Sequence, residues 1–361
     1  MKIDLIVGAR PNFMKIASLI NAIDKSKDKS LQYRIIHTGQ HFDKSMSQNF
    51  FDQLSIPLPD YNFKAGGGTQ AEQTGKIMVK YEEILKRKPP KICIVVGDVT
   101  STMACAIVAK KENVKVAHVE AGIRSFDLTM PEEINRMVTD SISDYFFTTS
   151  KIANKNLMKN GVKKESIVFV GNTMIDTLIK HRKSFFKPKI WDRLGLKAHN
   201  FIVLTMHRPS NVDDLKNINK IISILIKNCK NYKIVFPCHP RTKRQLQNLS
   251  ESYPYMYLTG PLSYLEFNFL VENCKAVITD SGGITEEATY LRVPCLTLRE
   301  NTERPETIEI GTNELVGSDP HKIKSALETL FSGNWKKGDV PELWDGKSGE
   351  RIIRFLLTEL K

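Results

Sequence analysis

Residues 92–120 read ICIVVGDVTSTMACAIVAKKENVKVAHVE, and this stretch decides the fold. An apolar run, Ile92–Val96, is followed by Gly97 and Asp98, and a segment of helical character, Thr102–Lys110, comes next. A second apolar run, Val114–Val119, then ends at Glu120. Strand, helix and strand in this order predict a βαβ unit with parallel strands.

The same alternation extends in both directions from this unit. Expected strands of the first half are Ile3–Val7, Tyr33–His37, Tyr145–Thr148 and Ile167–Val170, with helices at Met14–Ile23, Ala71–Leu85 and Pro131–Ile142. Expected strands of the second half are Phe201–Thr205, Lys233–Pro237, Met256–Leu258, Ala276–Thr279 and Cys295–Leu298. The pattern predicts an α/β protein with two Rossmann-like domains, each a parallel sheet covered by helices on both faces.

A length of 361 residues and 41% hydrophobic content fit two domains with substantial cores. We expect domains at residues 1–175 and 176–361, because Lys, Arg, Phe and Pro accumulate without a clear strand in residues 172–200. The last amphipathic segment, Gly349–Leu360, could pack on either domain.

Composition narrows the function classes. The formal charge is +13, but the lysines are scattered, without a basic stripe or nucleic-acid motif, so a solvated surface is expected rather than nucleic-acid binding. No signal peptide and no apolar run of roughly 20 residues is present, which predicts a cytoplasmic protein without membrane contact. Six dispersed cysteines without CxxC spacing favour free buried thiols over disulfides or a metal site.

Ligands of open parallel sheets bind at the carboxyl ends of strands, so the residues after each strand are the candidates. Arg10 and Lys15 follow the first strand at a helix start, where they could meet an anion; alternatively, Pro11 merely starts the helix and both cations are solvated. The GxGxxG fingerprint is absent here, which argues against a nicotinamide cofactor.

The clearest anion site is residues 279–287, TDSGGITEE, where a strand passes through a small-residue turn into a helix. Ser281, Gly282 and Gly283 would present backbone N–H groups and the positive end of the helix dipole to a pyrophosphate. Glu287 could accept hydroxyls of a ribose, or it could simply complement the helix dipole.

Three carboxylates of the first half could act on a substrate. Asp98 and Glu120 follow neighbouring strands, and Glu132 follows Pro131. Asp98 could instead cap a helix, and Glu132 could be an ordinary first-turn acid. Glu120 ends an apolar strand and needs a partner, such as Arg124 or Arg136.

Two further segments of the second half carry candidates. His207 and Arg208 follow a strand and could grip a phosphate, although a lone histidine is more often structural. Arg304 could do the same or pair with neighbouring acids.

Seven segments in this order resemble the non-hydrolysing UDP-N-acetylglucosamine 2-epimerases, a family with the two-domain GT-B fold and an interdomain cleft. They are residues 8–15 (GARPNFMK), 97–98 (GD), 118–124 (HVEAGIR), 130–136 (MPEEINR), 207–208 (HR), 280–283 (DSGG) and 302–305 (TERP). The resemblance implies Asp98, Glu120, Glu132 and His207 in catalysis. It implies substrate binding by Arg10, Lys15, Arg136, Phe267, Ser281, Gly282, Gly283, Glu287 and Arg304.

The resemblance also implies the chemistry: UDP leaves C1 of the sugar, the C2 proton becomes acidic, and a 2-acetamidoglucal re-adds UDP after protonation on the other face. The resemblance implies a homodimer and implies no metal or redox cofactor. Pro209, Ser210 and Gly66–Gly68 depart from the pattern of allosterically activated members, although Gln40, His41, Arg208 and His239 remain, so strong activation by substrate is not expected.

Several alternatives stay open. The short segment between Arg124 and Pro131 also resembles relatives that act on UDP-2,3-diacetamido uronic acids. A GT-B glycosyltransferase, a hydrolysing epimerase and a non-catalytic nucleotide-sugar sensor are the remaining readings of the same residues.

Overall fold

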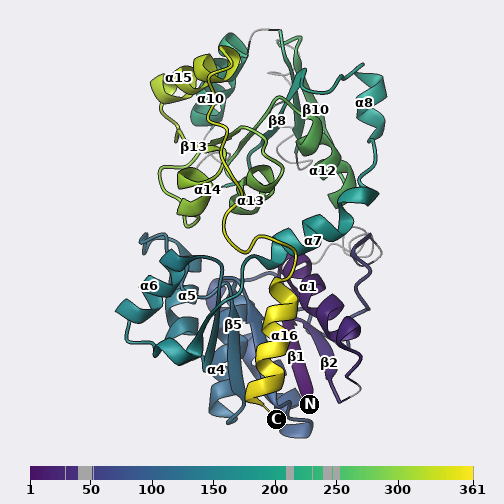
Figure 1. The fold of residues 1–361 in the computed structure, drawn as a ribbon, viewed down its shortest axis with the longest axis vertical. Helices are drawn as coiled ribbons and strands as arrows, with labels where there is room; N and C mark the ends of the chain where they lie inside the picture. The colour runs from purple at the N-terminus through teal and green to yellow at the C-terminus, as the bar shows by residue number, and fades with distance from the viewer. Residues whose placement is uncertain are drawn as a thin grey trace. The chain divides into compact units, whose positions relative to one another are not determined.

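The computed structural model describes residues 1–28, 30–39, 51, 53–208, 215–229, 231–238, 246 and 253–360. The chain divides into two compact units (Figure 1). Unit 1 comprises Met1–Lys180 and Glu342–Lys361, and unit 2 comprises His181–Pro341. The expected division between residues 175 and 176 lies inside helix α7 (Thr173–His181), whereas the units separate at the end of that helix.

Unit 1 contains a seven-stranded parallel sheet in the order β3-β2-β1-β4-β5-β6-β7. Its strands are β1 (Lys2–Val7), β2 (Gln32–His37), β3 (Tyr61–Asn62), β4 (Ile92–Val96), β5 (Lys115–Val119), β6 (Tyr145–Thr148) and β7 (Ile167–Phe169). The strand order reverses between β1 and β4, and such a switch point leaves a crevice at the carboxyl ends of the two strands.

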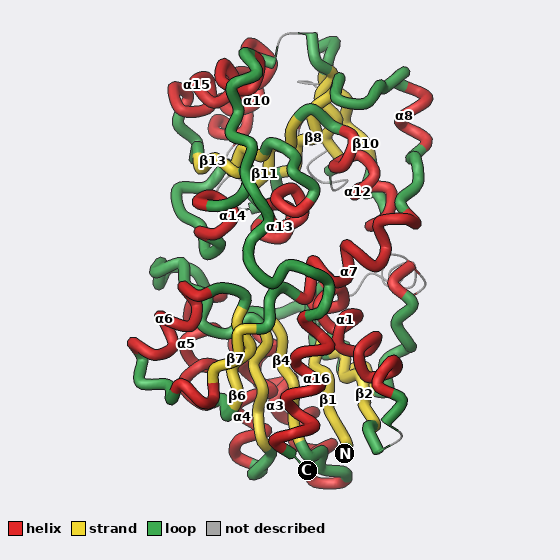
Figure 2. Tube along the Cα trace, viewed as in Figure 1, coloured by secondary structure: helices red, strands yellow, loops and turns green. Residues whose placement is uncertain are grey.

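Helices cover both faces of this sheet (Figure 2). They are α1 (Arg10–Ser26), α3 (Gln70–Arg87), α4 (Thr100–Lys111), α5 (Pro131–Ile142), α6 (Lys151–Lys159), α7 and α16 (Ser348–Glu359), with a short 3₁₀ helix at Lys164–Ser166. The strands alternate their side chains between the faces: Ile6, Cys93 and Val95 belong to the core under α3 and α4.

The last helix, α16, belongs to unit 1. It packs against α1, and Phe355 makes edge contacts with Tyr145 and Phe147, at centroid distances of 5.5 and 5.6 Å. The buried carboxylate of Asp176 in α7 fixes the start of α16 by accepting hydrogen bonds from Ser348 Oγ at 2.9 Å and Gly349 N at 2.8 Å.

Ser18 Oγ of α1 donates to the same Asp176 carboxylate at 2.7 Å. Burial raises the pKa of Asp176 even though these hydrogen bonds oppose the shift. One buried carboxylate therefore ties together three helices that are distant in the sequence.

Unit 2 contains a six-stranded parallel sheet in the order β10-β9-β8-β11-β12-β13, with its switch point between β8 and β11. Its strands are β8 (Phe201–Thr205), β9 (Lys233–Pro237), β10 (Met256–Thr259), β11 (Ala276–Thr279), β12 (Cys295–Thr297) and β13 (Asn313–Leu315). Its helices are α8 (Lys189–Arg193), α10 (Leu215–Asn228), α12 (Tyr264–Asn273), α13 (Gly282–Tyr290), α14 (Pro305–Glu309) and α15 (Pro320–Phe331), with a 3₁₀ helix at Arg182–Ser184.

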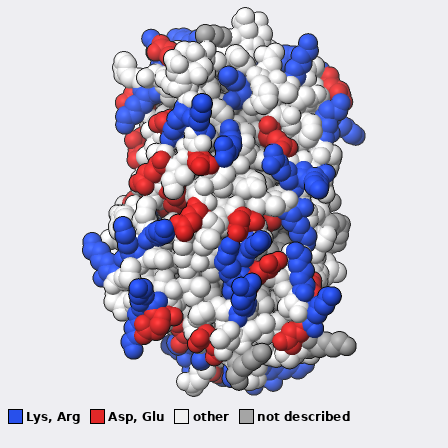
Figure 3. Space-filling view, viewed as in Figure 1, with Lys and Arg blue, Asp and Glu red and all other residues white. Residues whose placement is uncertain are grey.

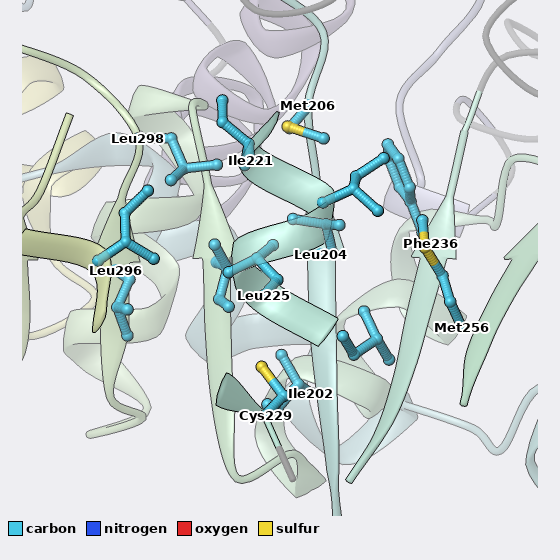
Figure 4. Packing of buried hydrophobic residues seen from close by; sticks show 14 of the residues in the cluster. Ile202, Leu204, Met206, Ile221, Leu225, Cys229, Phe236, Met256, Leu296 and Leu298 are labelled. Carbon is cyan, nitrogen blue, oxygen red and sulfur yellow. The ribbon is translucent and has the colours of Figure 1, made fainter. Parts of the chain in front are cut away.

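The unit 2 sheet has an apolar core on each face. Ile202 and Leu204 of β8 pack with Ile221 and Leu225 of α10 on one face (Figure 4), while the intervening residue Val203 packs on the other. The strand residues on this face are two positions apart, and the helix residues that pack on them are four positions apart. These are the spacings of one face of a strand and one face of a helix, as the sequence pattern predicts. The α/β fold class with two parallel sheets is therefore confirmed.

Two features that the composition predicts are the distribution of surface charge and the burial of the cysteines. Lys and Arg side chains lie among Asp and Glu side chains on the face shown in Figure 3. All six cysteines are buried, which confirms the prediction of buried thiols. Over the residues that the structure describes, no helix combines the length and the apolar character needed to cross a bilayer.

Candidate active site

The turn between β1 and α1 is held by Asn12. Its Oδ1 accepts hydrogen bonds from the backbone N–H groups of Gly8 at 3.2 Å and Ala9 at 2.8 Å, and its Nδ2 donates to Val96 O at 3.1 Å. The start of α1 is thus fixed to the end of β4, across the switch point of the sheet. Arg10, the first residue of α1, is half-buried at this turn.

Lys15 and Glu120 form a buried ion pair at the same edge. Lys15 Nζ lies 2.6 Å from Glu120 Oε2, and their side chains are 7% and 2% exposed. Glu120 has a φ of 69°, a left-handed conformation that is uncommon for a residue with a side chain. Such strained residues concentrate at functional sites, because the surrounding structure must hold them in place.

Gly97, at the end of β4, makes room for this pair. Its φ is +68°, and a Cβ at this position would lie 2.7 Å from Lys15 Nζ. A side chain here would displace the lysine, so the close approach requires glycine.

Asp98 is held by Arg136 of α5. Arg136 Nη2 donates to Asp98 Oδ2, and Arg136 Nη1 lies 2.7 Å from Glu133 Oε2. Asn135 Nδ2 donates to the backbone oxygen of Asp98 at 2.8 Å. The Asp98 side chain remains 27% exposed, so a carboxylate oriented by an arginine lies at the accessible edge of the sheet.

Glu132 lies apart from this pairing. It is exposed in the first turn of α5, whereas the next residue, Glu133, is 1% exposed and also accepts a hydrogen bond from Ser125 N at 2.9 Å. Arg136 is therefore joined to Asp98 and Glu133, and the catalytic role of Glu132 stays a prediction.

A buried polar network supports these loops from within unit 1. His118 Nδ1 lies 2.7 Å from Asp140 Oδ1, and His118 Nε2 lies 2.8 Å from the backbone oxygen of Gly97. Arg124 Nη1 lies 2.6 Å from Asp140 Oδ2. Burial would raise the pKa of Asp140, but His118 and Arg124 outweigh burial and lower it.

In unit 2, His207 and Asp280 meet at the switch point between β8 and β11. His207 Nδ1 lies 2.7 Å from Asp280 Oδ1; the aspartate side chain is fully buried and the histidine side chain is 63% exposed. The backbone N–H groups of His207 and Arg208 also donate to the Asp280 carboxylate, at 3.1 and 3.0 Å.

The turn that follows Asp280 leads directly into α13. Ser281 is the N-cap residue, with Gly282 and Gly283 as the first two helical residues, and all three are partly accessible. Thr279 Oγ1 accepts from Ser281 N at 3.0 Å. The helix start thus has the geometry of an anion site, with backbone N–H groups and the positive dipole end together.

Glu287 belongs to α13, and Phe267 belongs to α12. Glu287 is 3% exposed, and Asn268 Nδ2 lies 3.5 Å from its Oε1. Burial and the nearby Glu287 raise the pKa of Tyr264. Phe267 is partly buried against the core of the sheet.

Arg304 is buried and paired. Its Nε lies 2.6 Å from Glu286 Oε1, and the side chains are 8% and 0% exposed. Arg304 thereby joins the start of α14 to α13, so the arrangement corresponds to the pairing alternative for this residue.

Sequence reasoning did not single out His118, Asp140 or Asp280 as site residues. His118 and Asp280 each begin a segment that resembles the family, and a histidine inside the apolar strand β5 is a further signal, because a buried imidazole needs polar partners. The expected allosteric positions Gln40, His41, Pro209, Ser210 and His239 lie outside the described residues. Among the described residues, no three His, Cys, Asp or Glu side chains gather in a way that could hold a metal ion.

The sequence profile of a family described as UDP-N-acetylglucosamine 2-epimerase matches residues 23–357. The enzyme of that name from Methanocaldococcus jannaschii is 40% identical over 374 residues, which cover 99% of this chain and 99% of the relative. Its crystal structure in complex with UDP-GlcNAc and UDP superposes with a TM-score of 0.88, covering 99% of this chain and 100% of the other.

Two other proteins are informative. UDP-2,3-diacetamido-2,3-dideoxy-D-glucuronate 2-epimerase of Pseudomonas aeruginosa is 37% identical over 360 residues, covering 99% of both chains. The lipopolysaccharide outer core galactosyltransferase WaaB is only 14% identical, with a TM-score of 0.58 over 99% of this chain and 100% of that one, and this likeness concerns the fold alone.

Proposed function

The chain belongs to the UDP-N-acetylglucosamine 2-epimerase family, and we propose that it interconverts UDP-N-acetylglucosamine and UDP-N-acetylmannosamine without net hydrolysis. The observation that carries the proposal is the buried Lys15–Glu120 pair beside Asp98 at the switch point of the unit 1 sheet. The similarity to the M. jannaschii enzyme over nearly the whole of both chains supports the same activity.

The chemistry must begin at C1 of the sugar. The C2 hydrogen is not next to a carbonyl, so a carboxylate cannot remove it from the intact substrate at a useful rate. When the C1–O bond breaks, its electron pair leaves with UDP and the ring gains oxocarbenium character. The C2 proton can then pass to a carboxylate, and the C2–H electron pair forms the C1=C2 bond of 2-acetamidoglucal.

Return of UDP to C1 and protonation of C2 on the opposite face complete the epimerisation. Two faces require two proton-transfer groups, and we propose that these are drawn from the three carboxylates Asp98, Glu120 and Glu132. Glu120 is strained and buried, and Lys15 fixes its carboxylate.

Stabilisation of the leaving diphosphate is assigned to Arg10, Lys15, His207 and the start of α13. The start of α13 offers a phosphate the N–H groups of Gly282 and Gly283 and the hydroxyl of Ser281, and its dipole favours the charge that develops as UDP departs. We assign uridine and ribose contacts to Phe267 and Glu287.

We assign substrate binding to Arg136 and Arg304 as well. Each is buried and also orients the carboxylate with which it pairs, Asp98 for Arg136 and Glu286 for Arg304.

The test is proton NMR of the protein with UDP-N-acetylglucosamine in deuterated water. The expected result is UDP-N-acetylmannosamine with deuterium at C2. Free UDP with N-acetylmannosamine would instead identify a hydrolysing epimerase, and product formation only with an added acceptor would identify a glycosyltransferase. Unchanged substrate would refute the proposal.

A second candidate is epimerisation of UDP-2,3-diacetamido-2,3-dideoxyglucuronate. The 37% identity to the P. aeruginosa enzyme over 99% of both chains favours it, as does the short segment between Arg124 and Pro131. Parallel incubations with the two UDP-sugars, compared by kcat/KM, decide between them.

The remaining assignments are a homodimer, a cytoplasmic location and a role in supplying precursors of surface polysaccharide. They are supported by family membership. Light scattering coupled to gel filtration measures the oligomeric state directly.

A further inference from the structure

Asp280 occupies a position that the reaction scheme does not yet use. We propose that Asp280 is a positioning residue, which holds the ring of His207 in one orientation and one tautomer and acts on catalysis through it. The catalytic part of this inference rests on the proposed function, whereas the part about the tautomer does not.

The hydrogen bonds define what Asp280 does. Its carboxylate is fully buried at the end of β11 and accepts from two consecutive backbone N–H groups, those of His207 and Arg208. An ionised carboxylate can only accept hydrogen bonds, so the His207 Nδ1 atom at 2.7 Å must carry a proton and donate it.

Nδ1 is therefore committed to Asp280, and Nε2 is the ring nitrogen left for a ligand. In the neutral ring Nε2 is an acceptor, and in the imidazolium it is a donor. The side chain is 63% exposed, so little other packing fixes the ring. The carboxylate supplies the orientation and also stabilises the positive charge of the imidazolium.

The same aspartate links His207 to the anion-binding turn. Asp280 is followed directly by Ser281, the N-cap residue of α13. The ends of β8 and β11 are further joined by a 2.6 Å hydrogen bond between Thr205 Oγ1 and Thr279 Oγ1. A ring that leaves Nε2 for a ligand and a helix start that donates from its N–H groups are thus held in a fixed relation by one buried carboxylate.

The tautomer can be measured without any substrate. In nitrogen-15 NMR of the labelled full-length protein, the His207 resonances are assigned by their loss in His207→Asn. At a pH above which the His207 nitrogen-15 shifts no longer change, the ring is neutral, and we expect it to carry its proton on Nδ1. In Asp280→Asn the side-chain amide can donate to Nδ1, so the proton should move to Nε2. A wild-type ring protonated on Nε2, or a tautomer unchanged in Asp280→Asn, would overturn the proposal.

A double-mutant cycle tests the catalytic part. Asp280→Asn should lower kcat by about 100-fold, in the range that one oriented donor to a developing negative charge contributes. The double variant with His207→Asn should be no slower than His207→Asn alone, because Asp280 acts through the ring. Additive losses would mean that Asp280 acts independently of His207, and would refute the positioning role.

Asp176→Asn is the matched control. It makes the same change at a buried, hydrogen-bonded carboxylate of unit 1, so it reports the general cost of an amide at such a site. It should leave the His207 tautomer unchanged. If the wild-type protein does not epimerise any UDP-sugar, the proposed function fails, while the NMR comparison still decides whether Asp280 sets the tautomer.

Discussion

Replacing Lys15 with methionine should destabilise unit 1 strongly. The change leaves the Glu120 carboxylate, which is 2% exposed, without the ammonium group that lies 2.6 Å from it. Loss of one partner of a buried ion pair costs about 3–5 kcal/mol, because the remaining charge is desolvated without compensation.

The size of the thermal shift follows from the size of the unit. Unit 1 comprises about 200 residues, for which each kcal/mol corresponds to about 2–4 °C. We therefore expect the unit 1 transition to fall by about 6–20 °C in scanning calorimetry. Hydrogen exchange of the β1, β4 and β5 amides identifies that transition.

Two further variants test whether the loss comes from the buried pair: one replaces a lysine of an exposed pair as a control, and the other removes both buried charges. Lys86→Met removes a lysine from an exposed pair with Glu82, whose side chains are 59% and 46% exposed, and should change the free energy of unfolding by less than about 1 kcal/mol. Lys15→Met/Glu120→Met removes both buried charges and should recover most of the lost stability without activity. If Lys15→Met melted with the wild type, or if the double variant lost the sum of the single effects, the pair would not be the buried interaction described above.

The other predictions concern packing at a close helix contact and the stability of the fold at low pH. Gly349→Ala places a Cβ 2.5 Å from Ser18 Oγ, so it should lower the free energy of unfolding by about 1–3 kcal/mol and increase hydrogen exchange in α16. Gly75→Ala is the control, because a Cβ there has nothing within 4 Å, and it should cause neither change. Burial lowers the pKa of His37 to about 4, so the folded state resists protonation while the unfolded state accepts it below about pH 6.5. Stability should therefore fall by about 2 kcal/mol between pH 7 and pH 5 in urea titrations, and less in His37→Leu. The lowered pKa of Asp140 acts in the same direction at lower pH: its contribution is present above about pH 4 and is lost as the pH falls further, a loss that Asp140→Asn should not show.

The strands of the two sheets could be predicted where burial made them apolar throughout. Ile92–Val96, Tyr145–Thr148 and Ala276–Thr279 begin and end in the structure where the sequence pattern places them. The edge strands β3 (Tyr-Asn) and β13 (Asn-Glu-Leu) were missed because neither contains an apolar run, whereas the equally short β7 and β12 do.

The position of candidate residues after strand ends could be predicted from the sequence, but the residues with which they pair could not. The rule that ligands bind after strand ends points to Asp98, Glu120 and His207 without any knowledge of pairing. Pairing joins residues far apart in sequence, such as Lys15 with Glu120, and depends on which loops the sheet order brings together. Adjacent acids such as Glu132 and Glu133 point to different sides of a helix, and the sequence pattern does not say which one is buried.

The return of α16 to unit 1 affects the order in which the protein can fold during synthesis. Unit 2 is one continuous segment, His181–Pro341, so its core can close as soon as that segment has left the ribosome. Unit 1 begins first, but Asp176 obtains its Ser348 and Gly349 partners only when the final segment emerges. The domain that starts first is thus the domain that finishes last, and until then the aromatic surface that receives Phe355 is open to chaperones.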